Sequence, residues 1–495
     1  MSEVRVTYSG LIGLAIGLIT VITGMIFILI ITRNLTPEEL GTWSLIGGLI
    51  SYVIIIEPFI SYWTKREIAR DIESGKTAIL SSGIFSVVGT IAYLVIAYFV
   101  SQQIDVDSEI LFLAALMIPF TFLNRTLSSI ALGWKPHLNS LGVLIFDIAK
   151  LPPIIFFVYY LDQSVDGIIL SIIFAYIVSN VVLVILLRKK LQNKIRYRYL
   201  KNWLKRSWLP SYIKFSNLIV LDVLIFSMIT GSVTGLAYWT VAFTVGTMVR
   251  HSSQITRAVY PKLLSGARKE YLQENLIRLF YFVFPFIAVS ISFAKPGLYA
   301  LYPLYDIAAL VVVFITLRSF LKILASALTQ ALQGIENVDT KESSQKDYLK
   351  SKLFYLPTIR LINRAVYFST LAIGLLILTQ SNYSEMDLVL YWSIIAFIVQ
   401  VPFTVYFYYL VRKNFPLSID ISSTMKYLIT SIVVFGGIYF LMEKFLVYTP
   451  KIIEFLPQLI PYLILGFLTY ACITYLIDKR TRNLFNGIIK EIKSR

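Results

Sequence analysis

Long apolar runs recur along the whole sequence, and they constrain its fold more than any other feature. Fourteen runs of about 20 residues or more alternate with short polar segments, over residues 8–32, 41–63, 78–100, 109–132, 139–161, 166–187, 209–231, 235–257, 276–294, 304–332, 353–379, 387–411, 425–446 and 456–477. A helix of that length crosses the hydrocarbon core of a bilayer and satisfies its own backbone hydrogen bonds there. The sequence therefore predicts an all-α polytopic membrane protein with about fourteen transmembrane helices.

The composition also favours a lipid environment over water. Charged residues make up 15% of the chain and apolar residues 57%, and the mean hydropathy is +0.73. A soluble domain typically carries about 25% charged residues, so this chain has too few charges to cover a water-facing surface. The first apolar run is too long for the apolar part of a cleavable signal peptide, and we expect it to be the first span.

Basic residues are concentrated in every second loop, which predicts how the helices are oriented. With a cytoplasmic N-terminus, most of the 45 Lys and Arg residues fall in cytoplasmic segments, and the outside loops hold Arg33, Lys295, Lys444 and Lys451. We therefore expect a multi-pass protein of the cell (plasma or inner) membrane with both termini in the cytoplasm. The net charge of +17 is explained by loops near anionic lipid, so no nucleic-acid partner is expected.

Two long polar breaks, at residues 188–206 and 334–352, divide the chain. The first alternates Lys and Arg with Tyr and Trp, which is typical of an amphipathic segment on the inner membrane surface. The predicted organisation is an N-terminal lobe of six helices over residues 1–190, a basic cytoplasmic linker over 191–208, a C-terminal lobe of six helices over 209–412, and two further helices with a cytoplasmic tail over 413–495.

Few residues are suited to metal or nucleophilic chemistry. The chain has one cysteine, Cys472, and two histidines, His137 and His251, which excludes internal disulfides and histidine-based metal motifs. We expect no catalytic residue, no metal and no cofactor. A membrane-embedded glycan polymerase or ligase is disfavoured, because it would present acids or histidines outside, and all the predicted outside loops are short.

Charged residues inside the predicted spans are the candidate functional residues, because an ionisable group at that depth is costly unless it is paired or meets water. The cations are Arg125, Lys150, Lys214, Arg250, Arg318, Lys322 and Arg364, and the acids are Glu57, Asp147 and Asp222, with Asp306 near an outer end. The bundle interior is therefore predicted to carry an excess of positive charge.

Five of these cations are predicted to bind an anionic substrate in a hydrated cavity: Arg125, Lys150, Arg250, Arg318 and Arg364. Arginine stays protonated even at high cost, and its guanidinium group can donate two parallel hydrogen bonds to a phosphate group. The alternative is that the cations form interhelical ion pairs or extend to the inner membrane surface.

The intramembrane acids are candidate coupling or ion-pair residues. Asp147 and Lys150 lie three residues apart on one helix, so they share a face and would partly neutralise each other. Glu57 and Arg125 are predicted at a similar depth, so they could pair. Asp222 could pair with any of the cations.

Helix breakers and aromatic residues accompany these charges. Pro58, Pro119 and Pro152 predict bent helices of the kind found at transporter binding sites. Tyr238 and Trp239 are predicted either to belong to an interfacial aromatic belt or to line a cavity and stack on sugar rings.

The segment ITRNLTPEELGTWSLIGGL, Ile31 to Leu49, resembles the start of the polysaccharide and lipid-linked oligosaccharide flippases (Wzx-like) of the multidrug/oligosaccharidyl-lipid/polysaccharide exporter (MOP) superfamily. In that family the first span ends in a pattern like aRxLgpeefGxyslixxl. The matching residues here are Arg33, Leu35, Pro37, Glu38, Glu39, Gly41, Trp43 and Ser44.

The resemblance implies a V-shaped alternating-access carrier with a cationic central cavity, in which the last two helices form a groove for a lipid tail. It further implies that the protein moves an isoprenoid-(pyro)phosphate-linked oligosaccharide from the cytoplasmic to the outer leaflet, for assembly of a surface polysaccharide or glycoprotein. The implied partners are that lipid-linked glycan, membrane lipids and glycan-assembly proteins, and the protein is expected to act as a monomer.

The alternative within the same superfamily is a cation-coupled antiporter of small molecules or drugs. Cation-coupled exporters of that type often use an acid in the first span, and span one has none here. A positive cavity would also repel cationic drugs. Both features favour the lipid branch of the superfamily.

Overall fold

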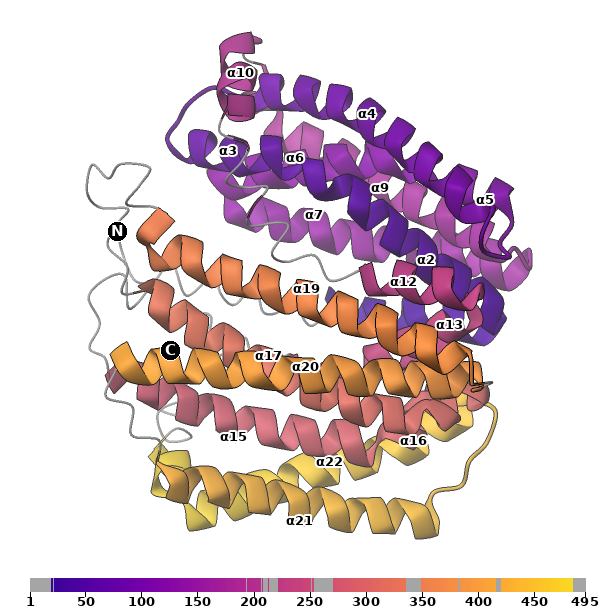
Figure 1. Ribbon diagram of the computed structural model, residues 1–495, viewed down its shortest axis with the longest axis vertical. Coiled ribbons are helices and arrows are strands. Elements are labelled where there is room, and N and C mark those ends of the chain that lie inside the picture. Colours follow the sequence, from indigo (N-terminus) through magenta and orange to yellow (C-terminus); the bar gives the residue numbers. More distant parts are fainter. Residues whose placement is uncertain are drawn as a thin grey trace. The chain divides into compact units, whose positions relative to one another are not determined.

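The computed structural model describes residues 19–20, 22–192, 194–205, 207, 212, 221–250, 252, 270–334, 349–381, 383–414 and 420–483. Within these residues the regular elements are all helices (Figure 1). Eleven helical spans in the described part are long and apolar enough to cross a membrane: Pro37–Ile56, Gly75–Ser101, Ser108–Trp134, His137–Tyr160, Val165–Leu191, Leu272–Ser292, Pro303–Gln333, Phe354–Thr379, Glu385–Asn414, Ile421–Phe445 and Ile452–Ile477. The all-α polytopic class predicted from the sequence is confirmed.

The other three predicted spans extend into residues outside the described part. They are the first, seventh and eighth, at residues 8–32, 209–231 and 235–257. Their described portions contain the apolar helices Ile22–Asn34 and Leu221–Thr230 and the helix Thr234–Gly246. The total of fourteen is compatible with the structure and remains a prediction.

The chain divides into two compact units by its internal contacts. Unit 1 comprises Met1–Ala237 and Ala372–Asn382, and unit 2 comprises Tyr238–Leu371 and Tyr383–Arg495. The contact-defined boundary follows Ala237, whereas the predicted lobes meet at the linker over residues 191–208. Parts of that linker lie outside the described residues, so the lobe boundaries stay a prediction.

Unit 1 is a bundle of helices in which α6 contacts α3, α4, α7 and α9. Its elements are α2 (Pro37–Val53), η1 (Ile54–Ile56), α3 (Pro58–Ala69), α4 (Gly75–Ser101), α5 (Ser108–Ala114), α6 (Met117–Trp134), α7 (Pro136–Ala149), α8 (Leu151–Ile154), the π-helical turn η2 (Ile155–Tyr160), α9 (Val165–Leu191), α10 (Tyr197–Lys205) and α12 (Leu221–Thr230).

The motif that carries the family resemblance is a helix start. The Thr36 hydroxyl accepts a hydrogen bond from the Glu39 amide at 3.3 Å, and the Glu39 carboxylate accepts one from the Thr36 amide at 2.8 Å. This reciprocal pair is a capping box, and Pro37 adds a preset first-turn geometry. Gly41 is required by a close approach, because a Cβ there would lie 1.9 Å from the carbonyl oxygen of Val233.

Prolines interrupt two spans of unit 1 beside charged residues, as the sequence predicted. The span Pro37–Ile56 passes through η1 and Glu57 into α3, which starts at Pro58. The α7–α8 junction is at Lys150, just before Pro152 and Pro153. In both places the backbone stays helical, because the carbonyl that loses its donor to a proline accepts from a nearer amide: the Ile54 carbonyl from the Glu57 amide at 3.1 Å, and the Ile148 carbonyl from the Lys150 amide.

The basic linker forms the amphipathic helix α10, and this helix packs against α3 and α4. Trp203 is 2% exposed, and its indole nitrogen donates to the Glu67 carboxylate at 2.9 Å. The Arg196 amide donates to the Thr77 hydroxyl at 3.0 Å, while Lys201 and Lys205 are exposed. Loops predicted for the same membrane side therefore meet within unit 1; which side is the cytoplasm remains a prediction.

Unit 2 contains a continuous apolar core, formed largely by α15, α17, α21 and α22. Its elements are α13 (Thr234–Gly246, from Tyr238), α15 (Glu270–Ser292), α16 (Ala294–Leu301), η4 (Pro303–Ala308), α17 (Ala309–Gly334), α19 (Lys352–Thr379, up to Leu371), α20 (Glu385–Asn414), α21 (Ile421–Phe445) and α22 (Ile452–Ile477). Figure 1 shows α21 beside α22, and their contacts agree.

A hydrogen bond from α22 compensates a proline in α15. Pro285 lies inside α15 and has no amide hydrogen, so the carbonyl of Tyr281, one turn earlier, loses its usual donor. The Tyr470 hydroxyl donates to that carbonyl at 2.7 Å. In an apolar environment a neighbouring helix has to satisfy such a group, and this bond fixes α22 to α15.

Candidate functional site

Intramembrane charges are distributed unevenly between the two units. The buried acids Glu57, Asp147 and Asp222 all belong to unit 1, while Asp478, the buried acid of unit 2, follows the end of the last span. In the described spans of unit 2, the acids Glu274, Asp306, Glu385, Asp387, Glu443 and Glu454 lie within four residues of a span end. Arg318 and Arg364 of unit 2 lie deeper, and Arg318 is the middle residue of the span Pro303–Gln333.

Lys150 and Asp147 form the ion pair that their spacing predicted. The Lys150 ammonium lies 2.6 Å from the Asp147 carboxylate, and the two side chains are 10% and 9% exposed. The rings of Phe27 and Phe146 lie 4.8 and 5.5 Å from the same ammonium. Lys150 is thus neutralised inside unit 1, which makes it the weakest of the predicted anion ligands.

The suggested pair of Glu57 with Arg125 is not formed. Glu57 is 3% exposed and accepts a hydrogen bond from the Ser61 hydroxyl at 3.1 Å. Arg125 lies on an exposed part of α6 and makes no ion pair with any described residue. Arg125 is exposed while Glu57 is buried, so the predicted similarity in depth does not bring the two charges together.

Asp222 is buried in the first turn of α12, which packs against α2. Its carboxylate accepts a hydrogen bond from the Val223 amide at 3.1 Å. Lys214 and His251, which the sequence analysis also singled out, lie outside the described residues.

Arg318 is the most distinctive cation of unit 2. It is 4% exposed on α17, and its guanidinium carbon lies 4.5 Å from the centre of the Tyr367 ring of α19. Within the described part of the chain it has no carboxylate partner, and its Nε has no hydrogen-bond acceptor. The face of the guanidinium is therefore stabilised by an aromatic ring, while its Nε has no acceptor among the described residues.

The ring beneath Arg318 is itself held in place by two tryptophans. The Trp392 indole nitrogen donates to the Tyr367 hydroxyl at 2.7 Å, and both residues are almost fully buried. The rings of Trp392 and Trp239 stack with centroids 3.8 Å apart and planes 6° apart. We call Tyr367, Trp392 and Trp239 the aromatic clamp; it fixes the position of Arg318 without supplying a negative charge.

Trp239 is consequently part of the core of unit 2. It is 5% exposed, so it has no free face for a sugar ring in this structure. Its neighbour Tyr238 is half-buried and packs edge-on against Tyr305, with centroids 5.6 Å apart.

Other cations of unit 2 are near the clamp in the fold. Arg250 is half-buried and lies 4.9 Å from the centre of the Phe243 ring. Arg364 is half-buried on α19, three residues before Tyr367. Lys322 is half-buried one turn after Arg318 on α17.

Sequence reasoning missed Arg360, which belongs with this group. It lies one turn before Arg364 on α19 and donates to the Thr329 hydroxyl of α17 at 2.5 Å. The spacing of four residues puts Arg360 and Arg364 on one helix face. That spacing was the signal in the sequence that could have revealed Arg360.

Solved structures of MOP-superfamily transporters share this fold. The lipid II flippase MurJ, in an inward closed conformation, matches with a TM-score of 0.63 and 14% identity, over 95% of this chain and all 100% of that chain. An inward-facing multidrug resistance transporter of the MATE family matches with a TM-score of 0.58 and 13% identity, over 81% of this chain and 98% of that chain.

A MOP-superfamily transporter from Pyrococcus furiosus, described as having a binding pocket of reverse polarity that suggests a different function, matches with a TM-score of 0.51 and 15% identity, over 83% of this chain and 95% of that chain. No protein-family model matches the sequence, and no curated protein is similar to it. The chain is therefore a multi-pass membrane protein with the fold of the MOP-superfamily transporters. Its structural neighbours are transporters and flippases rather than enzymes.

Proposed function

We propose that this protein is a flippase for an isoprenoid-(pyro)phosphate-linked oligosaccharide, which it moves from the cytoplasmic to the outer leaflet during assembly of a surface polysaccharide or glycoprotein. The observation that carries the proposal is Arg318, a buried cation at the middle of a span, with an aromatic ring on its face and no carboxylate among the described residues. The fold of the MOP superfamily, which includes a lipid II flippase, supports a carrier of this kind.

Energetics explain why Arg318 points to an anionic substrate. Burying a charged side chain costs several kcal/mol even after relaxation of the surroundings. A desolvated cation–π contact returns about 2 kcal/mol, which offsets only part of that cost. In a transport state that exposes Arg318, which is 4% exposed here, a phosphate oxygen that reaches the guanidinium would supply the remainder through charge-assisted hydrogen bonds.

The neighbouring arginines extend this site within unit 2. Arg250 and Arg364 are proposed to bind the same phosphate or pyrophosphate group, with Arg360 and Lys322 adding positive potential. Arg125, exposed on unit 1, stays a candidate contact, and Lys150 is neutralised by Asp147. The isoprenoid tail would remain in lipid. No bond is made or broken, so transport depends on different affinities for the substrate in the inward- and outward-open states.

The runner-up is a cation-coupled antiporter of small molecules. The observation in its favour is the pair of buried carboxylates Glu57 and Asp222 in unit 1, the type of group that exchanges a proton or binds a cation. Under the flippase proposal the same two residues are candidates for coupling transport to an ion gradient.

Deletion of the gene and analysis of the lipid-linked glycans tests the proposal. We expect a lipid-linked glycan to accumulate on the cytoplasmic side, and wild-type protein to restore the surface glycan. Arg318→Ala combined with Arg364→Ala should fail to restore it, although the variant inserts normally. Arg412→Ala, at the exposed end of α20, is the matched control and should restore it. A normal surface glycan with altered drug sensitivity in the deletion strain would favour the antiporter.

A further inference from the structure

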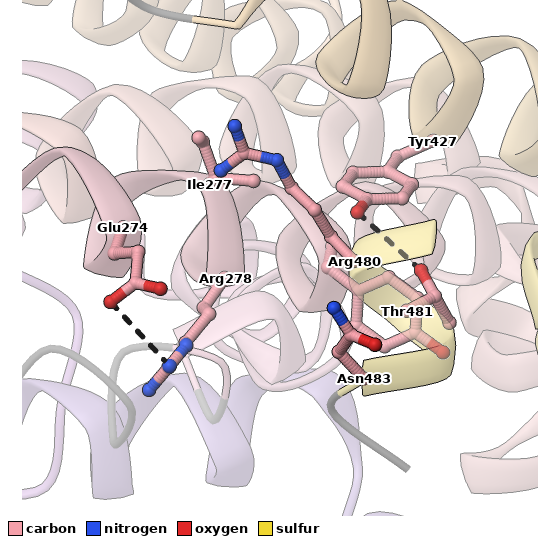
Figure 2. A pocket seen from close by; sticks show the side chains of 8 residues that line it. Glu274, Ile277, Arg278, Tyr427, Arg480, Thr481 and Asn483 are labelled. Atoms are coloured by element: carbon pink, nitrogen blue, oxygen red, sulfur yellow. Dashed lines mark hydrogen bonds and ion pairs between the residues drawn. The ribbon is translucent and has the colours of Figure 1, made fainter. Parts of the chain in front are cut away.

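A small polar pocket lies at the ends of α15 and α22 and beside α21, on the side predicted to be cytoplasmic (Figure 2). Its lining comes from three separate segments: Glu274, Ile277, Arg278 and Tyr281 of α15, Tyr427 of α21, and Arg480, Thr481 and Asn483 after α22. The cavity measures about 170 Å³, several times the ~30 Å³ that one water molecule occupies in the liquid. A phosphate group fits a volume of this size.

Two guanidinium groups and one amide supply donors at this pocket. Arg278 lies 3.7 Å from Glu274, and Arg480 lies 3.1 Å from Asp420, with both arginines 46% exposed. Each guanidinium has five N–H donors, so a single carboxylate contact leaves most of them available. The Arg278–Glu274 contact is long and solvent-exposed and stabilises little, which lets Arg278 turn toward an anion.

The base of the pocket is fixed by hydrogen bonds to Asp478. The Tyr427 hydroxyl donates to this carboxylate at 2.6 Å, and the backbone and hydroxyl of Thr481 donate at 3.0 and 3.2 Å. Burial raises the pKa of Asp478, but these hydrogen bonds and one from Ser423 outweigh it, so the pKa lies below its usual value. The negative charge of Asp478 is thus screened by local donors rather than presented to the pocket.

The net charge around the pocket is positive. Residues 274–281, 420–427 and 478–483 contain five Lys or Arg residues and three acids. Beside the pocket, apolar side chains face outward: Ile421 is 71% exposed on α21, and Leu476 is 73% exposed on α22. Basic groups next to outward-facing apolar helix surfaces are the setting in which a membrane protein meets an anionic lipid headgroup.

We propose that this pocket binds a phosphate group, as a second anion site separate from Arg318. The phosphate would accept hydrogen bonds from Arg278, Arg480 and the Asn483 amide. It can be carried by an anionic phospholipid of the inner leaflet, whose tails would lie along α21 and α22, or it can be free in solution. The proposal is independent of the flippase function, because binding at this pocket is measured without transport.

Native mass spectrometry of the purified full-length protein in detergent tests this inference. The probes are phosphatidylglycerol, which carries a net negative charge, and phosphatidylcholine, whose choline neutralises the phosphate. The variant is Arg278→Gln with Arg480→Gln. The matched control is Arg412→Gln with Lys413→Gln, which removes the same charge from the exposed end of α20.

We expect wild type and control to bind phosphatidylglycerol in preference to phosphatidylcholine. The pocket variant should bind phosphatidylglycerol at least about tenfold more weakly, since tenfold is the loss expected for one charge-assisted hydrogen bond and the variant removes two arginines. Inorganic phosphate at constant ionic strength separates the two sources: displacement of the lipid indicates a site open to free phosphate, and no displacement indicates a lipid site. The inference is overturned if wild type shows no preference between the two lipids, or if both double variants lose the same affinity.

Discussion

Replacing Arg318 by methionine should make the protein more stable while abolishing its transport. Methionine keeps a flexible apolar stem of similar length but carries no charge. The substitution removes the penalty of a desolvated guanidinium that no described carboxylate neutralises, together with the contact to Tyr367. A functional residue that lowers stability is expected where binding, rather than folding, requires the charge.

The size of the effect follows from two opposing contributions. The desolvation penalty for one buried ion is several kcal/mol, and the cation–π contact returns about 2 kcal/mol. Losing both leaves a net stabilisation that we place at about 1–3 kcal/mol, in the range found when buried ionic groups are replaced by apolar side chains of similar volume. In a chain of this length, that corresponds to a rise of a few degrees in Tm.

Lys150→Met is the matched control, because it removes the same charge from a cation that does have a partner. Asp147 would be left buried and unpaired, which typically costs about 3–5 kcal/mol. The two substitutions should therefore shift Tm in opposite directions. Thermal unfolding of the purified variants in detergent, followed by tryptophan fluorescence, measures both shifts under the same conditions.

A loss of stability in Arg318→Met comparable to that in Lys150→Met would refute the reasoning. It would mean that Arg318 is held by a negative charge in the folded protein, as Lys150 is. An increase in Tm with transport retained would separate the two ideas: Arg318 would be an unpaired cation, but not a ligand of the substrate.

Substitutions also test three other parts of the structure. Tyr367→Phe keeps the ring beneath Arg318 and should reduce transport per folded molecule less than fivefold, whereas Tyr367→Leu removes the ring and should reduce it about tenfold or more; equal effects would contradict the aromatic clamp. Gly41→Ala places a methyl group 1.9 Å from the Val233 carbonyl and should sharply lower the yield of monodisperse protein, while Gly47→Ala, with nothing within 4 Å, should not. Asp478→Asn should lower Tm at neutral pH, because the amide replaces an acceptor of several hydrogen bonds. The pKa of Asp478 is depressed in the folded protein, so its ionised carboxylate contributes stability above about pH 4, and this contribution is lost as the pH falls through the folded-state pKa. The Tm difference between variant and wild type should therefore shrink at acidic pH. A difference that stays constant with pH would argue against this role of Asp478.

The spans and one ion pair were predictable from the sequence because both depend on local geometry. Apolar run length decides whether a helix can cross a bilayer, and a spacing of three residues brings Asp147 to Lys150 on any helix. Depth in the membrane, in contrast, does not determine which way a side chain points around the helix axis. Glu57 and Arg125 therefore share a depth without forming a pair.

The surroundings of Arg318 depend on tertiary contacts that no local pattern encodes. Tyr367 and Trp392 come from two later helices, and Trp239 comes from an earlier one. The sequence identified Arg318 as an unusual charge and Trp239 as an unusual aromatic residue, yet it did not indicate that an aromatic stack connects them. Arg360 differs from these residues, because a local pattern could have identified it: its spacing of four residues from Arg364 is visible in the sequence.

The bond between Tyr470 and the Tyr281 carbonyl makes two positions energetically dependent on each other. A donor missing at Pro285 is replaced by a hydroxyl 189 residues later than its acceptor. Tyr470→Phe should be damaging beside Pro285 and nearly harmless once Pro285→Ala restores the helix's own amide. A double-mutant cycle over these residues should be strongly non-additive, and in related sequences the tyrosine and the proline should be kept or lost together.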